Sequence, residues 1–238
     1  MNVVLFKYQF KPHWAVIVLT LLFIALFTRL GFWQLSRANE KKQMLAMAQT
    51  LSQKQAIKWP SGEILPKQYQ RLNTQGYFLP AVFLLDNQHY QHQFGYDVIS
   101  PLVLTNGDVV LVDRGWVAAD LMRHALPSID SPNGLVDIDG SAYYPSSKNW
   151  LLGPAMDKKD ENLAIIELID TQLISQFLHK SVYPFIIRLS SQSKYGFVRD
   201  WPVIAMSVER HYGYAFQWFA IAFAIFIIFI ILNMKKKV

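Results

Sequence analysis

The stretch Glu209–Leu232 has the sequence ERHYGYAFQWFAIAFAIFIIFIIL and decides the fold. It carries no charged residue from Tyr212 onward. At a rise of about 1.5 Å per residue, a helix of this length covers the roughly 30 Å hydrocarbon core of a bilayer. A single segment can cross lipid only as a helix, because lipid offers no partner to backbone N–H and C=O groups. The stretch therefore predicts a transmembrane helix over residues 212–232.

A second apolar run lies near the N-terminus. Residues 14–27 are apolar apart from Thr20, and the run extends to Leu35 with one charge, Arg29. A cleaved signal peptide is the alternative, but the bulky and charged stretch that follows has no small-x-small cleavage site. We therefore expect an uncleaved transmembrane helix over residues 13–35.

Lysines set the expected orientation of these two spans. They flank the outer ends of both runs, as Lys7, Lys11, Lys235, Lys236 and Lys237. Two spans place both termini on one side, and flanking lysines favour the cytoplasm, whereas a long intervening loop is translocated largely regardless of charge. We predict a bacterial inner-membrane protein with this order of parts: cytoplasmic tail 1–12, helix 13–35, periplasmic domain 36–211, helix 212–232 and cytoplasmic tail 233–238.

The composition excludes several classes of protein. The chain has 238 residues, of which 52% are hydrophobic and 14% aromatic, and its formal net charge is +6. The basic residues cluster at the span ends or are scattered, so no basic stripe indicates a nucleic-acid partner. Cysteine is absent, which excludes disulfides, thiolate metal sites, covalent c-type haem attachment and cysteine catalysis.

The domain between the spans begins with a helix and continues with strands. Apolar residues recur at helical spacing from Ser36 to about Gln55, which predicts a continuation of the first span. Asn106-Gly107 predicts a hairpin turn with positive φ angles. We expect a short helix at 170–178 and a mostly antiparallel sheet or small barrel, hence a membrane protein of the α+β class. The predicted strands are 69–78, 82–87, 96–104, 109–117, 136–142, 164–168 and 185–189.

Catalytic motifs are not evident in the sequence. It contains no Gly-rich phosphate loop, no His-Glu-x-x-His and no Gly-x-Ser-x-Gly. His89 and His92 are three residues apart, but they lie in a Gln-rich stretch without a nearby set of carboxylates, so a solvated loop is favoured over a metal site. We expect no enzymatic activity and no metal site of this kind.

A charged and aromatic cluster ends one predicted strand. Asp113-Arg114-Gly115-Trp116 directly follows an apolar run. The cluster is interpreted either as an interior ion pair or turn that supports the domain, or as an edge that docks a partner or ligand.

Several sequence blocks together resemble one family over nearly the whole chain. They are Leu30–Arg37 (LGFWQLSR), Leu84–Gln88 with Gly95–Leu102, Gly107–Val117 (GDVVLVDRGWV) and His211–Phe219 (HYGYAFQWF). Each is weak alone, but their order and the two-span topology resemble the Surfeit locus protein one family of cytochrome oxidase assembly factors. The chain departs from the family pattern at Asp113, where Asn is usual, and at Glu209-Arg210, where Asn-Asn is common.

The resemblance implies a role in building the haem-copper oxidase. It implies help at the stage where haem a enters subunit I, with haem a bound transiently and with subunit I and the haem a synthase machinery as partners. Two rival classes stay open: a scaffold that holds oxidase subunits without binding haem, and a membrane-anchored enzyme.

The residues favour a haem groove between the two spans. A neutral imidazole is a common ligand of haem iron, and His211 stands at the mouth of the second span. Helical spacing places His211, Tyr214 and Trp218 on one face, and Arg29, Trp33 and Arg37 on one face of the first span. We expect these faces to meet, with His211 as the axial ligand, Trp33 and Trp218 beside the ring, and Arg29 or Arg37 at the propionates. Interface aromatics without a ligand are the alternative.

Overall fold

The computed structural model describes residues 3–5, 8–60, 64–120, 122, 124–146 and 153–236. The predicted positive flanks Lys7 and Lys237 therefore lie outside the described residues. The chain divides into two compact units, the first formed by Met1–Ala46 with Val203–Val238 and the second by Met47–Pro202.

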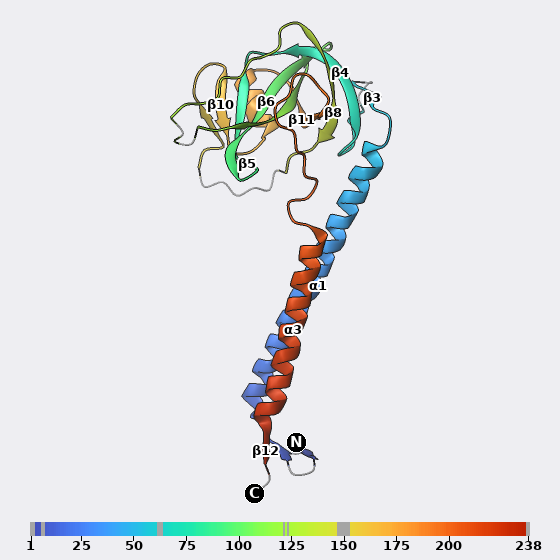
Figure 1. Ribbon diagram of the computed structural model, residues 1–238, viewed down its shortest axis with the longest axis vertical. Coiled ribbons are helices and arrows are strands. Elements are labelled where there is room, and N and C mark those ends of the chain that lie inside the picture. Colours follow the sequence, from blue (N-terminus) through green and yellow to red (C-terminus); the bar gives the residue numbers. More distant parts are fainter. Residues whose placement is uncertain are drawn as a thin grey trace. The chain divides into compact units, whose positions relative to one another are not determined.

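Two long helices form the first unit, α1 (Trp14–Ser52) and α3 (Val208–Asn233). Both are long and apolar enough to cross a membrane, which agrees with the two predicted spans. They run antiparallel and side by side (Figure 1). The helix α1 continues without a break beyond the apolar run to Ser52, as the periodicity predicts.

A close approach fixes the helix pair. Gly31 of α1 faces the ring of Phe219, and a Cβ at Gly31 would lie 2.6 Å from that ring. Phe32 packs edge-on against the same ring, with centroids 5.3 Å apart. Small residues allow helices in lipid to approach closely, because packing rather than water exclusion holds them together. Two further small residues of α3, Ala215 and Ala222, are also buried.

The chain ends meet at one end of the helix pair. Strands β1 (Val3–Leu5), β2 (Tyr8–Phe10) and β12 (Met234–Lys236) pair antiparallel in the order β1-β2-β12. The first and last described strands therefore lie at the same end of the two helices, as two spans require.

The second unit is a strand-rich domain with one short helix, α2 (Thr171–Leu178), among its described residues. Its strands follow the order β3-β4-β8-β11-β7-β6-β5-β10-β9, and β4 also pairs with β6. That pairing closes a ring through β4, β8, β11, β7 and β6, which is a small barrel. The strands are β3 (Ile57–Lys58), β4 (Arg71–Phe78), β5 (Val82–Tyr90), β6 (Gln93–Leu104), β7 (Val109–Ala118), β8 (Leu135–Tyr143), β9 (Met156–Lys158), β10 (Leu163–Ile166) and β11 (Val182–Leu189).

The sheet is mixed, although most of its strand pairs are antiparallel, as predicted. Hairpin neighbours such as β5–β6 and β6–β7 pair antiparallel, whereas β3–β4, β5–β10 and β7–β11 are parallel. Parallel neighbours need long crossover connections, and these connections are not visible in a series of short strand signals. The predicted class, helices with a strand-rich domain, agrees with the fold at this coarser level.

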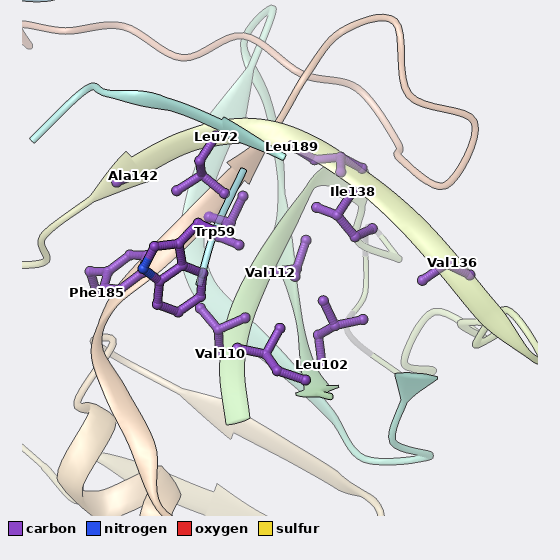
Figure 2. Packing of buried hydrophobic residues seen from close by; sticks show 12 residues of the cluster. Trp59, Leu72, Leu102, Val110, Val112, Val136, Ile138, Ala142, Phe185 and Leu189 are labelled. Carbon is purple, nitrogen blue, oxygen red and sulfur yellow. The ribbon is translucent and has the colours of Figure 1, made fainter. Parts of the chain in front are cut away.

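Alternating side chains fill the barrel. The strand β4 alternates between exposed and buried residues over its length, as a half-buried strand should. Its inner residue Leu72, with inner residues of the other ring strands, belongs to the core shown in Figure 2. Trp59 belongs to this core and contacts Tyr183 and Phe185 edge-on.

A second apolar layer covers the outer face of the central strands. Phe83, Ile99, Leu111 and Ile186 are buried there with Ile174 of α2. The strand β7 is therefore covered on both faces, which explains its continuous apolar run from Val109 to Val112.

Two turns differ from their predicted form. Leu104 and Asp108 close a three-residue loop in which Gly107 alone of the expected Asn-Gly pair has a positive φ, 89°. This geometry matches a hairpin whose last loop residue is left-handed. The predicted Gln-rich loop is in fact the end of the β5–β6 hairpin, with positive φ at Gln91 and His92. Its residues are polar because the hairpin tip extends into solvent, where His89 is exposed.

Candidate functional site

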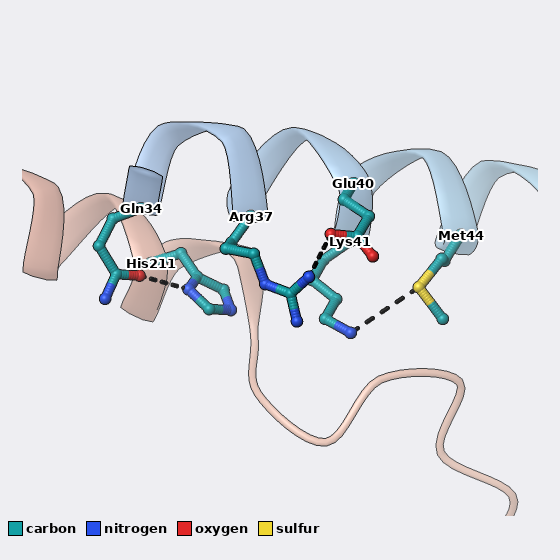
Figure 3. Close-up of polar contacts among 6 residues, drawn as sticks. All are labelled: Gln34, Arg37, Glu40, Lys41, Met44 and His211. Atoms are coloured by element: carbon teal, nitrogen blue, oxygen red, sulfur yellow. Dashed lines mark hydrogen bonds and ion pairs between the residues drawn. The ribbon is translucent and has the colours of Figure 1, made fainter. Parts of the chain in front are cut away.

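His211 lies in the first turns of α3 and faces α1. Its Nδ1 is 2.7 Å from Oε1 of Gln34, and Figure 3 shows the two side chains pointing toward each other. The residue is only 8% exposed. Its other ring nitrogen, Nε2, is buried and has no hydrogen-bond partner among the residues that the structure describes. A free imidazole nitrogen is thus held between the two helices.

Aromatic rings lie deeper along the same interface. Trp218, two helical turns after His211, stacks on Phe27 of α1 with ring centroids 5.6 Å apart and an interplanar angle of 16°. The Trp218 Nε1 is also buried, and no described part of the chain offers it a hydrogen-bond partner. Ala215, between His211 and Trp218, is 2% exposed. The interface therefore combines flat aromatic surface with two unsatisfied ring nitrogens.

Cationic side chains of α1 lie beyond Gln34, on the side away from the aromatic rings. Arg37 and Lys41 project from the same side of α1 as Gln34 (Figure 3). Arg37 Nη1 lies 2.6 Å from Glu40 Oε2 in a half-exposed ion pair, and Lys41 Nζ contacts Met44 Sδ at 3.8 Å. Along the helix pair, the order is aromatic rings, then His211, then cations.

Some predicted groove residues do not lie at this interface. Trp33 is 53% exposed and Tyr214 is 42% exposed, and Arg29 is exposed as well. The face of α1 that contacts α3 is formed by Phe27, Gly31 and Gln34 at i, i+4 and i+7. Trp33 is two residues from Gly31 and therefore points to the opposite side of the helix. Of the predicted residues, His211 and Trp218 both lie at this interface, two helical turns apart, and Arg37 lies one turn from Gln34.

Phe27 and Gln34 are the interface residues that sequence reasoning missed. Both stand at helical spacing from Gly31, the smallest residue of the first span. Because small residues mark helix contacts in lipid, Gly31 was the signal that could have identified this face.

The strand-end cluster is buried within the barrel domain. Arg114 is 4% exposed and donates from Nε to the carbonyl of Tyr195 (2.8 Å) and from Nη1 to the carbonyl of Asp130 (3.0 Å) and Ser100 Oγ (3.4 Å). Its guanidinium also lies over the rings of Phe78 and Phe197. Burial lowers the pKa of Arg114. These three hydrogen bonds go to neutral oxygens rather than to the carboxyl group of the adjacent Asp113.

Trp116 completes the cluster on the same strand. It is 9% exposed, and its Nε1 donates to the carbonyl of Gln88 at 3.4 Å. Burial of these side chains favours the interpretation that the cluster supports the domain.

Asp113 belongs to a group of charges on the outer face of the sheet. Arg188 is its register partner on β11, and Asp97 lies on β6, the other neighbour of β7. Burial raises the pKa of Asp97 to about 6, against the lowering effect of Arg188. Burial, with the charge of Asp97, raises the pKa of Asp113 well above its usual value. Arg188 lies over the Tyr143 ring at 3.6 Å.

These carboxyls predict an unusual pH dependence for Asp113→Asn. Both pKa values are raised, so the folded state holds protons that the unfolded chain releases above about pH 4. Their contribution to stability is present at low pH and is lost as pH rises. The introduced amide keeps an oxygen acceptor for the Gly115 N–H but cannot ionise. We expect the variant to melt a few degrees above the unmodified protein at pH 8, with the difference shrinking toward pH 5.

Thermal unfolding of the full chain in detergent, measured between pH 5 and 8, tests this. The exposed Asp157→Asn provides a control, since its pair with Lys159 lies at the surface and should contribute little. A Tm difference for Asp113→Asn that is constant across this range would contradict the assignment.

A polar cavity of about 450 Å³ opens elsewhere on the barrel domain. It is lined by Lys58, Trp59, Asn73, Gln75, Asp137 and Asp139, among others. None of the predicted site residues lines it. The helix interface around His211 and the cluster at the end of β7 therefore remain the two candidate sites.

The chain is thus a barrel protein whose barrel lies, in sequence, between two helices long and apolar enough to cross a membrane. The model of the SURF1 family matches residues 21–223. The chain is similar to the SURF1-like protein of Rickettsia bellii (strain RML369-C), with 28% identity over 84% of this chain and 83% of the relative. It is similar to that of Rickettsia felis (strain ATCC VR-1525 / URRWXCal2), with 28% identity over 85% and 89%.

The chain belongs to the SURF1 family, which is known as a family of oxidase assembly factors. The matched residues include both candidate sites. Membership confirms the resemblance inferred from the sequence blocks.

Proposed function

We propose that this protein binds haem a at the helix interface while the cofactor is inserted into subunit I of the haem-copper oxidase. The observation that carries the proposal is the buried, unpartnered Nε2 of His211. Buried polar atoms are nearly always satisfied, and an exception calls for an explanation such as a missing ligand. A haem iron that accepts this nitrogen would satisfy it.

The surrounding residues fit a large, flat, amphipathic cofactor. When bound, haem a supplies an iron that takes a neutral imidazole as an axial ligand. Trp218 and Phe27 provide aromatic surface on one side of His211. On the other side, Lys41 provides positive charge suited to a propionate carboxylate, beside the ion pair of Arg37 with Glu40. The interface is thus apolar where the ring would lie and cationic where its carboxylates would lie.

We further propose that the helices span the inner membrane with the barrel domain in the periplasm. Support comes from the lysines beyond the outer ends of both helices, which favour a cytoplasmic location for both termini. In this orientation, Arg37 and Lys41 lie toward the periplasmic end of α1.

Replacement of His211 by alanine tests the haem proposal. The His211→Ala protein, purified from cells that make haem a, should lose or shift the absorption bands of bound haem while still inserting in the membrane. His89→Ala is the matched control, because His89 is exposed at the hairpin tip and should leave the bands unchanged.

Unchanged haem binding and oxidase maturation in His211→Ala would overturn the proposal. The scaffold interpretation, in which the protein holds oxidase subunits without binding haem, would then take its place. Substrate turnover by purified protein would instead indicate an enzyme.

A further inference from the structure

We infer that Gln34 is a positioning residue, which fixes the tautomer of His211 so that Nε2 presents its lone pair to a bound iron. The purpose of this tautomer rests on the proposed haem role. The assignment of the tautomer rests only on the contact between Gln34 and His211. Gln34 Oε1 and His211 Nδ1 are 2.7 Å apart. An amide oxygen only accepts hydrogen bonds, so Nδ1 must carry the proton and Nε2 must be unprotonated.

The orientation of the Gln34 amide determines this result. The opposite orientation would direct the amide N–H toward Nδ1 and leave an N–H on Nε2, which no metal could bind. Either tautomer leaves Nε2 without a partner among the described residues, but in the structure Oε1 faces Nδ1 (Figure 3). The contact therefore presents the tautomer that a metal requires.

The backbone around Gln34 holds this contact firmly. Gly31, one turn before Gln34, allows the close approach to Phe219, and Ala215, one turn after His211, is buried in the same interface. Residues that orient a ligating histidine through its second nitrogen typically change metal affinity by about 10–100-fold when replaced. Gln34 occupies this place for His211.

The neutral amide of Gln34 differs from a carboxylate in its effect on His211. A carboxylate at this position would add a charge to the span, at considerable cost, and would draw the Nδ1 proton more strongly, which makes Nε2 a stronger ligand. The neutral Gln34 orients the ring with a weaker effect on Nε2. This arrangement suits a haem that is held and then released.

A haem-free measurement tests the tautomer directly. Nitrogen NMR of the full chain in detergent, with labelled histidine and assignment by His211→Ala, should show Nδ1 protonated and Nε2 unprotonated at pH 8. Gln34→Leu removes the acceptor and should shift this ratio toward protonated Nε2. A protonated Nε2 in the unmodified protein, or a ratio unaffected by Gln34→Leu, would overturn the inference.

A titration with haem a then tests the consequence. We expect Gln34→Leu to weaken binding about 10–100-fold and Gln34→Glu, which keeps the acceptor, to bind at least as tightly as the unmodified protein. Gln43→Leu is the matched control, because Gln43 is exposed on the same helix, and it should bind normally. Helix content by circular dichroism should be equal in all variants.

The outcomes separate this inference from the proposed function. If His211→Ala loses haem a but Gln34→Leu binds it like the control, the haem role stands and the positioning role of Gln34 is wrong. If His211→Ala also binds normally, the haem role fails, and the NMR measurement alone decides the tautomer.

Discussion

Arg114→Ala should destabilise the barrel domain by about 3–5 kcal/mol, since it leaves one buried and two part-buried acceptors without this donor and each costs about 1–3 kcal/mol. The acceptors are the carbonyls of Tyr195 and Asp130 with Ser100 Oγ. The variant also loses the contacts of the guanidinium with two aromatic rings. A loss of this size is a large share of the roughly 5–15 kcal/mol that stabilises a typical domain. Chemical unfolding of the full chain, followed by tryptophan fluorescence, measures it.

Arg71→Ala is the matched control for this prediction. Arg71 forms an exposed ion pair with Asp139 at 3.6 Å, and such pairs contribute about 0–1 kcal/mol. The steady-state level of Arg114→Ala in cells should fall along with its stability, whereas that of Arg71→Ala should not. Similar unfolding curves for the two variants would show that the hydrogen bonds of Arg114 are dispensable.

The spans and most strands are predictable because local patterns determine them. The apolar run in α3 and the run Val109–Val112 in β7 need no distant partner to be recognised. Closure of the barrel depends instead on Gly76–Phe78 of β4 pairing with the end of β6. The polar hairpin tip at Gln91 is likewise a strand end defined by backbone pairing with β6, not by its side chains.

Several residues of the candidate sites could be predicted from the sequence, but the residues that they contact could not. Periodicity shows which residues share a face of one helix, but it does not show which face meets the other helix. Gly31 and Phe219 determine that face, which brings Gln34 rather than Trp33 to His211. Arg114 is a similar case. Its acceptors include the carbonyl of Tyr195, which lies 81 residues further along the chain, and that of Asp130, which lies in an irregular segment.

Gly115→Ala should cost about 2–4 kcal/mol, because two independent features require glycine here. Its φ is +106°, a conformation that costs a residue with a Cβ about 1–3 kcal/mol. A Cβ at this position would also clash with the carbonyl oxygen of Val198 and lie 2.9 Å from Arg199 Cγ. That carbonyl accepts the Trp116 N–H at 2.7 Å, and the Val198 N–H donates back to Trp116 at 3.1 Å. The Val198 backbone cannot retreat without losing this bridge.

Gly134→Ala separates the two contributions. Gly134 has a similar φ of +84°, but an added Cβ would meet nothing within 4 Å. It should therefore show the backbone strain alone, and the extra loss in Gly115→Ala should report the close approach to Val198. Because the bridge holds the segment whose neighbouring carbonyl at Tyr195 binds Arg114, the double variant Arg114→Ala with Gly115→Ala should lose less than the sum of the two single losses. Equal losses for Gly115→Ala and Gly134→Ala, or additive losses in the double variant, would show that the bridge to Val198 does not couple these residues.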